Sequence, residues 1–213
     1  MRWIAVAIAL ALAGPAAAQV AAPPVRIVEA RTIDAGRTEG PLRLRLAAYT
    51  PAGGPWAAAE IDGATRAAAA ILGQCGIGLA SATLSTYEGD PRFRDYFTPW
   101  SRLLARALPP DRPALFFVAD TRNRPAFDAE AIGRGNSRSR PELADTVWVA
   151  FGTRDLAVAL AHELAHVLAD SGEHSDEPGN LMGEDTSPSA TRLTEAQCAR
   201  IVATGEGNGL LSR

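Results

Sequence analysis

This sequence has no long apolar run, no strongly basic stripe and no internal repeat. The apolar segment near its start, residues 3–13, is too short to span a bilayer, and no other segment is long and apolar enough to do so. The formal net charge of -3 argues against a general nucleic-acid binder. About 195 residues follow residue 18, which fits a single domain with a sizeable core.

Cysteine is nearly absent, since Cys75 and Cys198 are the only two in the chain. In an oxidising compartment an even pair favours a disulfide, and the alternative is two buried thiols. A zinc-binding role is less favoured because neither lies near the histidines in sequence. No cysteine follows the first apolar segment to accept a lipid, and none in residues 19–40 could act as a cysteine switch.

The first 18 residues have the pattern of a secretory signal peptide. Arg2 supplies the positive charge, residues 3–13 form the apolar region, and residues 16–18 give an A-x-A cleavage site before Gln19. The alternative is an uncleaved anchor. This pattern predicts a secreted or periplasmic protein that has no membrane contact after cleavage.

Histidine is also scarce, and all three histidines lie within residues 162–174. His162 and His166 are four residues apart, so on a helix both imidazoles share one face and can bind one metal ion. Glu163 follows the first of them and can act on a water molecule beside the metal. This H-E-x-x-H arrangement is typical of zinc peptidases. The alternative is a helix whose histidines and glutamate face solvent or make local pairs.

The segment around these histidines is apolar on nearly every side, which predicts a buried helix. Buried imidazoles and carboxylates need partners, and a zinc ion supplies them. A catalytic zinc site commonly has three protein ligands. His174 is the favoured third ligand, and the alternatives are nearby carboxylates: Asp170, Glu173, Asp176 and Glu177.

Hydrophobic periodicity predicts an α/β (α+β) fold with a twisted, mainly parallel sheet. Residues 19–40 are expected to be an extended lead-in, 41–205 the folded domain, and 206–213 a flexible tail. Expected strands cover 42–50, 77–86, 114–119 and 146–151, and expected helices cover 56–75, 101–108, the histidine segment and 194–205. Thr194 and Gln197 form a capping box at the start of the last helix, and Gly205 is placed at its end.

The chain resembles the metzincins, the zinc-peptidase clan that includes matrixins, astacins and snapalysin. His162, Glu163 and His166 match the clan's motif H-E-x-x-H-x-x-G-x-x-H position for position. Downstream, residues 178–182 (Pro-Gly-Asn-Leu-Met) resemble its Met-turn. The alternative for Met182 is ordinary core packing.

The resemblance departs at the clan's glycine and third histidine, which are Ala169 and Gly172 here. We expect the helix to continue for almost one extra turn, to break at Gly172, and to let the chain return to His174.

The resemblance implies a zincin/metzincin-like endopeptidase that cleaves peptides or proteins. We expect a monomer that binds no nucleic acid. Zn²⁺ would be held by His162, His166 and His174, Glu163 would activate the zinc-bound water, and Met182 would lie beneath the metal without binding it. An edge strand between residues 126 and 135 would pair with the extended substrate. Nearby arginines could favour acidic peptides or form only a solvated loop: Arg134, Arg138 and Arg140.

Two other functions remain open on the sequence alone. One is a catalytically weak zinc-binding domain that recognises a partner peptide in the same groove. The other is a peptidase of the gluzincin kind with Glu184 as third ligand, which Gly183 and Pro188 disfavour because they interrupt the helix such a ligand needs.

Overall fold

The computed structural model describes residues 23–34, 40–108, 111–122, 131–134 and 141–213. The expected signal peptide lies outside these residues. Within them, no helix is both long enough and apolar enough to cross a membrane.

One sheet forms the centre of the molecule, with its strands in the order β1-β3-β2-β4-β6-β5 and β7 paired to β2. The central strands β3, β2, β4 and β6 are parallel, whereas β1, β5 and β7 run antiparallel to their neighbours. This arrangement confirms the expected mainly parallel α/β fold. The strands are β1 (Arg26–Thr32), β2 (Leu42–Pro51), β3 (Ile77–Glu88), β4 (Ala114–Val118), β5 (Ala131–Arg134), β6 (Thr146–Ala150) and β7 (Leu211–Ser212).

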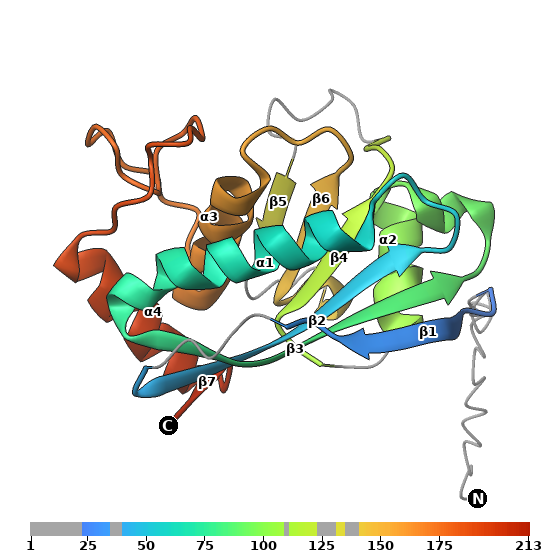
Figure 1. Cartoon of the computed structure of the whole chain (residues 1–213), viewed down its shortest axis with the longest axis horizontal. Helices are drawn as coiled ribbons and strands as arrows, with labels where there is room; N and C mark the ends of the chain where they lie inside the picture. The colour runs from blue at the N-terminus through green and yellow to red at the C-terminus, as the bar shows by residue number, and fades with distance from the viewer. Residues whose placement is uncertain (1–22, 35–39, 109–110, 123–130, 135–140) are drawn as a thin grey trace, which may run out of the picture.

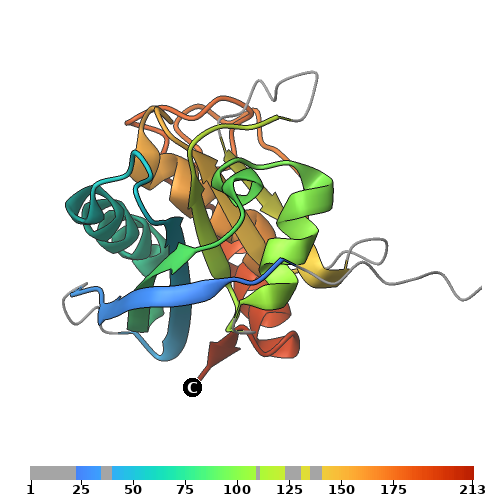
Figure 2. The same ribbon diagram turned by 90° about the vertical axis from the view of Figure 1, so that its right-hand side faces the viewer.

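Helices cover both faces of the sheet (Figures 1 and 2). On one face lie α1 (Ala58–Leu72) and α3 (Leu156–Ala169), and α4 (Glu195–Gly207) packs against α3. On the other face lies α2 (Thr98–Ala107). The histidine motif is therefore carried by a helix that is covered by the sheet, by α1 and by α4.

Strand β4 shows how the two cores are built. Leu115 and Phe117 point into the core beneath α1 and α3, whereas Phe116 points into the core beneath α2. Phe116 stacks on Trp148 with ring centroids 4.0 Å apart. Because such side chains each contribute about 1.5–3 kcal/mol on burial, a strand buried on both faces must be apolar throughout. The sequence of β4 meets that requirement.

Helix α3 is buried along almost its whole length, as its apolar sequence predicts. Its buried positions include His162 and Glu163, which are 4% and 8% exposed. The alternative of a solvent-facing helix is therefore wrong.

The two ends of the domain are more ordered than expected. Strand β1 falls within the expected lead-in and pairs with β3 over Arg26–Thr32. The expected flexible tail instead buries Leu210 and Leu211 and forms β7 beside β2. The sequence does not reveal β1 because most of its side chains are exposed and it is held by backbone hydrogen bonds to β3.

Gly205 does not end the last helix, because α4 continues to Gly207. A Cβ atom at Gly205 would lie 2.8 Å from Leu211 Cδ1, so a larger residue there would have to displace the buried Leu211 side chain of the C-terminal strand. The expected capping box is confirmed: the Thr194 side chain accepts from Gln197 N, and Gln197 Oε1 accepts from Thr194 N.

Cys75 and Cys198 form a disulfide, which confirms one of the two possibilities for this pair. The bond joins the 3-10 turn Gly73–Cys75, directly after α1, to the first half of α4. Next to it, the Gln74 side chain donates to Thr191 O and accepts from Leu193 N. The start of α4 is thus anchored to α1 by a covalent bond and by hydrogen bonds.

Two glycines inside helices should respond oppositely to alanine. Gly63 in α1 has nothing within 4 Å of a Cβ position, so Gly63→Ala should raise the free energy of unfolding by about 0.5–1 kcal/mol. Gly205→Ala should lower it by about 1–3 kcal/mol because the new methyl group overlaps Leu211. Urea unfolding of both variants measures the difference. Equal stabilisation by both would contradict the packing role of Gly205.

Candidate metal centre

The three histidine side chains converge on one point. His162 and His166 project from successive turns of α3 and place their Nε2 atoms 2.9 Å apart. His174, in the loop after the helix, places its Nε2 atom 3.2 Å from that of His166. Potential ligand atoms of the three residues all lie within 4.8 Å of one another. His162 is buried and His174 is exposed, so the cluster is open to solvent on one side.

Backbone carbonyls orient the two helical imidazoles. His162 Nδ1 lies 2.7 Å from Leu181 O, and His166 Nδ1 lies 2.6 Å from Ser171 O. Since a carbonyl oxygen can only accept, both Nδ1 atoms must carry the proton and donate. In the neutral rings, both Nε2 atoms then present lone pairs toward each other. Two lone pairs that face each other repel unless a cation lies between the two nitrogen atoms.

The spacing of the nitrogens fits zinc. Two nitrogens bound to Zn²⁺ at 2.0–2.1 Å with tetrahedral angles lie about 3.3 Å apart. The observed Nε2–Nε2 separations of 2.9 and 3.2 Å are close to that value. The three imidazoles can therefore hold a metal ion.

Burial also keeps the helical histidines neutral. It lowers the pKa of His162 below its ordinary value, and it lowers the pKa of His166 to about 4, with the neighbouring His162 adding to the effect. At neutral pH both rings are therefore unprotonated, which is the form that binds metal.

The turn after α3 differs from the expected one. The helix ends at Ala169, and the residue with left-handed backbone is Asp170, at φ 45°. Gly172 has no positive φ, so the expected extra helical turn and break at Gly172 are wrong. Aspartate can adopt this conformation, and the turn closes when Ser171 N donates to His166 O. The same turn places Ser171 O within hydrogen-bonding distance of His166 Nδ1.

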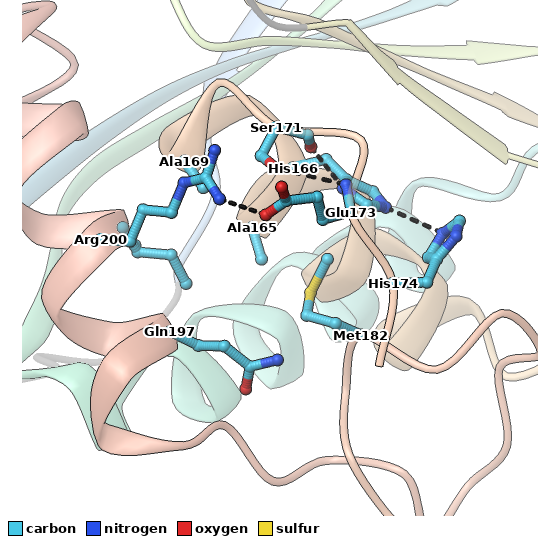
Figure 3. A pocket seen from close by; sticks show the side chains of 10 residues that line it. Ala165, His166, Ala169, Ser171, Glu173, His174, Met182, Gln197 and Arg200 are labelled. Atoms are coloured by element: carbon cyan, nitrogen blue, oxygen red, sulfur yellow. Dashed lines mark hydrogen bonds and ion pairs between the residues drawn. The ribbon is translucent and has the colours of Figure 1, made fainter. Parts of the chain in front are cut away.

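The segment resembling a Met-turn, residues 178–182, contacts the histidine site through two backbone carbonyls. Its Leu181 carbonyl accepts from His162, and its Met182 carbonyl accepts from Ser175 N, one residue after His174. Met182 is buried, and Figure 3 shows its side chain close to His166 and His174. Met182 belongs to the main core and also lines the pocket beside His166 and His174, so it has a packing role in either case.

The carboxylates considered as third ligands are placed differently. Glu173 forms an ion pair with Arg200 of α4 (Figure 3), and Glu177 lies 3.9 Å from Arg192. In the described part of the chain, the group of three or more potential ligands is the histidine triad, which contains neither Asp170 nor Asp176. Glu184 is exposed and outside the triad, which disfavours the gluzincin arrangement.

A pocket of about 120 Å³ lies beside the triad, between the end of α3, the following loop and α4 (Figure 3). Two polar residues that line this pocket were not expected from the sequence to lie near the site: Gln197 and Arg200. Gln197 is recognisable from the sequence as a helix cap, but its hydrogen bonds to Asn180 join α4 to the segment after α3. Only the tertiary structure brings these residues to the histidines.

An edge strand is present where the sequence suggested one. Within the part of the chain that the structure describes, strand β5 pairs with β6 alone, at the end of the sheet, and α3 packs nearby. Arg134 ends this strand, whereas Arg138 and Arg140 lie outside the described residues.

No protein-family model and no curated protein matches this sequence. Among solved structures, the fold is similar to metalloproteinase-II from Bacteroides fragilis, with a TM-score of 0.50 and 17% sequence identity. The match covers 77% of this chain and 53% of that one, so this chain spans about half the length of that protein. At this identity the likeness concerns the fold. The chain thus combines a metalloproteinase-like fold with a histidine triad able to hold a metal ion.

Single substitutions should show whether His174 or the neighbouring carboxylate of Glu173 is the third metal ligand. We expect His166→Ala to abolish stoichiometric zinc and His174→Ala to weaken zinc binding by more than about 100-fold, since even outer partners of ligands contribute 10–100-fold. Glu173→Ala is the matched control and should keep wild-type affinity, because Glu173 pairs with Arg200. Metal analysis after dialysis and chelator competition measure both. Weakened binding in Glu173→Ala together with unchanged binding in His174→Ala would reverse the assignment.

Proposed function

We propose that this protein is a zinc-dependent endopeptidase of the metzincin kind, similar to matrixins and snapalysin, and that it acts outside the cytoplasm. One observation carries the proposal: three imidazole Nε2 atoms converge beside a helix on which Glu163 directly follows the first histidine. The metalloproteinase-like fold supports it, and in this chain α3 packs against β5, the last strand of the sheet among the described residues.

The chain's residues divide the chemistry among them. When bound by His162, His166 and His174, zinc supplies Lewis acidity, which lowers the pKa of water and polarises a carbonyl group. The Glu163 carboxylate accepts a proton from the attacking water and delivers it to the leaving amine nitrogen. The carbonyls of Leu181 and Ser171 hold the helical imidazoles in the orientation that presents Nε2.

The substrate proposed is an extended segment of a peptide or protein. Strand β5 is the last strand of the sheet beyond β6 among the described residues, and an extended chain can add to such an edge by backbone hydrogen bonds. The exposed position of His174 leaves that side of the triad accessible.

Two features support a location outside the cytoplasm. The first is the signal-like pattern of the first 18 residues. The second is the Cys75–Cys198 disulfide, because such bonds persist in oxidising compartments.

Glu163→Gln tests the proposed base. The variant should retain one equivalent of zinc, because the ligands are untouched, and should lose peptidase activity by about 10²–10⁴-fold, because glutamine cannot take a proton. Zinc content and cleavage of a mixed peptide library, with and without chelator, are measured on the mature wild type and the variant.

Two outcomes of the library experiment would contradict the proposal. Wild-type turnover by Glu163→Gln would refute the base assignment. A wild-type protein that binds zinc and peptides without cleaving any would instead be a zinc-dependent peptide-binding domain.

A further inference from the structure

We infer that Gln197 of α4 is a positioning residue for the metal centre, acting through Asn180 and the turn that contains Met182. This inference rests on the proposed zinc site. Gln197 touches no metal ligand directly. Its effect would come from holding the backbone carbonyls that contact the ligands and their loop.

Gln197 and Asn180 form a reciprocal pair of amide hydrogen bonds. Asn180 Nδ2 donates to Gln197 Oε1 at 3.0 Å, and Gln197 Nε2 donates to Asn180 Oδ1 at 3.1 Å. Asn180 is 1% exposed and Gln197 is half-buried. Because a buried amide without partners costs free energy, each side chain requires the other.

A third hydrogen bond fixes the direction of the Asn180 amide. Met182 N donates to Asn180 Oδ1 at 2.8 Å. A flipped amide would place its NH₂ group against this N–H and against Gln197 Nε2. The oxygen of the Asn180 amide therefore faces a donor at residue 197. The amide of Gln197 both donates to Asn180 Oδ1 and accepts from Asn180 Nδ2.

The turn held in this way contacts one metal ligand and the backbone beside another. Leu181 O accepts from His162 Nδ1 at 2.7 Å, which sets the ring of the first ligand. Met182 O accepts from Ser175 N at 2.7 Å, directly after His174, the third ligand. A shift of residues 180–182 would therefore move the carbonyl that orients His162 and the carbonyl that holds the backbone next to His174.

The other end of the link is rigid. Gln197 lies in the first turn of α4, where it caps the helix with Thr194, and the next residue, Cys198, is disulfide-bonded to Cys75. The amide pair thus connects an anchored helix end to the turn beside the metal. Gln197 has two roles, helix cap and turn anchor, and a test must separate them.

Two substitutions at the same helix end separate the roles. Gln197→Glu keeps an oxygen that accepts from Thr194 N and from Asn180 Nδ2, but it has no donor for Asn180 Oδ1. The capping box is kept, whereas the hydrogen bond from residue 197 to Asn180 Oδ1 is lost. Thr194→Ala does the reverse, because it removes the oxygen that accepts from Gln197 N and leaves the amide pair in place.

The experiment uses the mature full chain and three measurements. These are thermal unfolding of the metal-free protein, zinc affinity by competition with a chromophoric chelator, and the visible spectrum of the cobalt-substituted protein. Both variants should lower the metal-free unfolding midpoint by a similar amount, about 2–4 °C. Only Gln197→Glu should weaken zinc binding, by about 10–100-fold, and alter the cobalt bands. Thr194→Ala should keep zinc affinity within about twofold of wild type and leave the cobalt spectrum unchanged.

Each remaining outcome overturns a stated claim. Wild-type zinc affinity in Gln197→Glu, or equal weakening in Thr194→Ala, would show that Gln197 acts only as a cap. A wild-type chain that binds no zinc would refute the proposed function itself. If Gln197→Glu does not fold, Gln197→Met, of similar length and uncharged, takes its place. It removes the acceptor for Thr194 N together with the amide pair, so zinc binding that is weaker in Gln197→Met than in Thr194→Ala supports the positioning role, and equal binding in the two overturns it.

Discussion

The burial of α3 is the constraint on which the rest of the structure depends. The helix is enclosed by the sheet, α1 and α4, so His162 and Glu163 are polar groups in a largely apolar core. Such groups are tolerated only with partners. The carbonyls of Leu181 and Ser171 satisfy Nδ1 of the helical imidazoles, which leaves their Nε2 atoms to meet at one point. The same burial keeps these rings neutral at physiological pH.

The segments after α3 are held by contacts that are distant in sequence. Arg200 of α4 pairs with Glu173 beside His174, and Gln197 of the same helix holds Asn180 in the turn. The disulfide to Cys75 and the docking of β7 against Gly205 fix that helix in turn. A loop with little secondary structure can thus present ligands with defined geometry, because its anchors lie on a rigid element.

The success of sequence-based prediction varied with how local each signal is. The apolar run of β4, the capping box at Thr194 and the buried helix around His162 rest on neighbouring residues, and all three are confirmed. The end of α3 was misplaced because glycine is the usual left-handed residue, whereas Asp170 takes that position here. Strand β1 was missed because its exposed side chains carry no alternating pattern and its pairing depends on β3.

By itself, the sequence determined that His162 and His166 share a face with Glu163 beside them, because helical periodicity needs only local spacing. It also limited the third ligand to a short set that included His174. Only the tertiary structure decided that His174 reaches the other two imidazoles and that Glu173 turns to Arg200 instead. It alone paired Asn180 with Gln197. These choices depend on where a loop meets a distant helix, and no local pattern encodes hydrogen bonds between residues that the fold brings together.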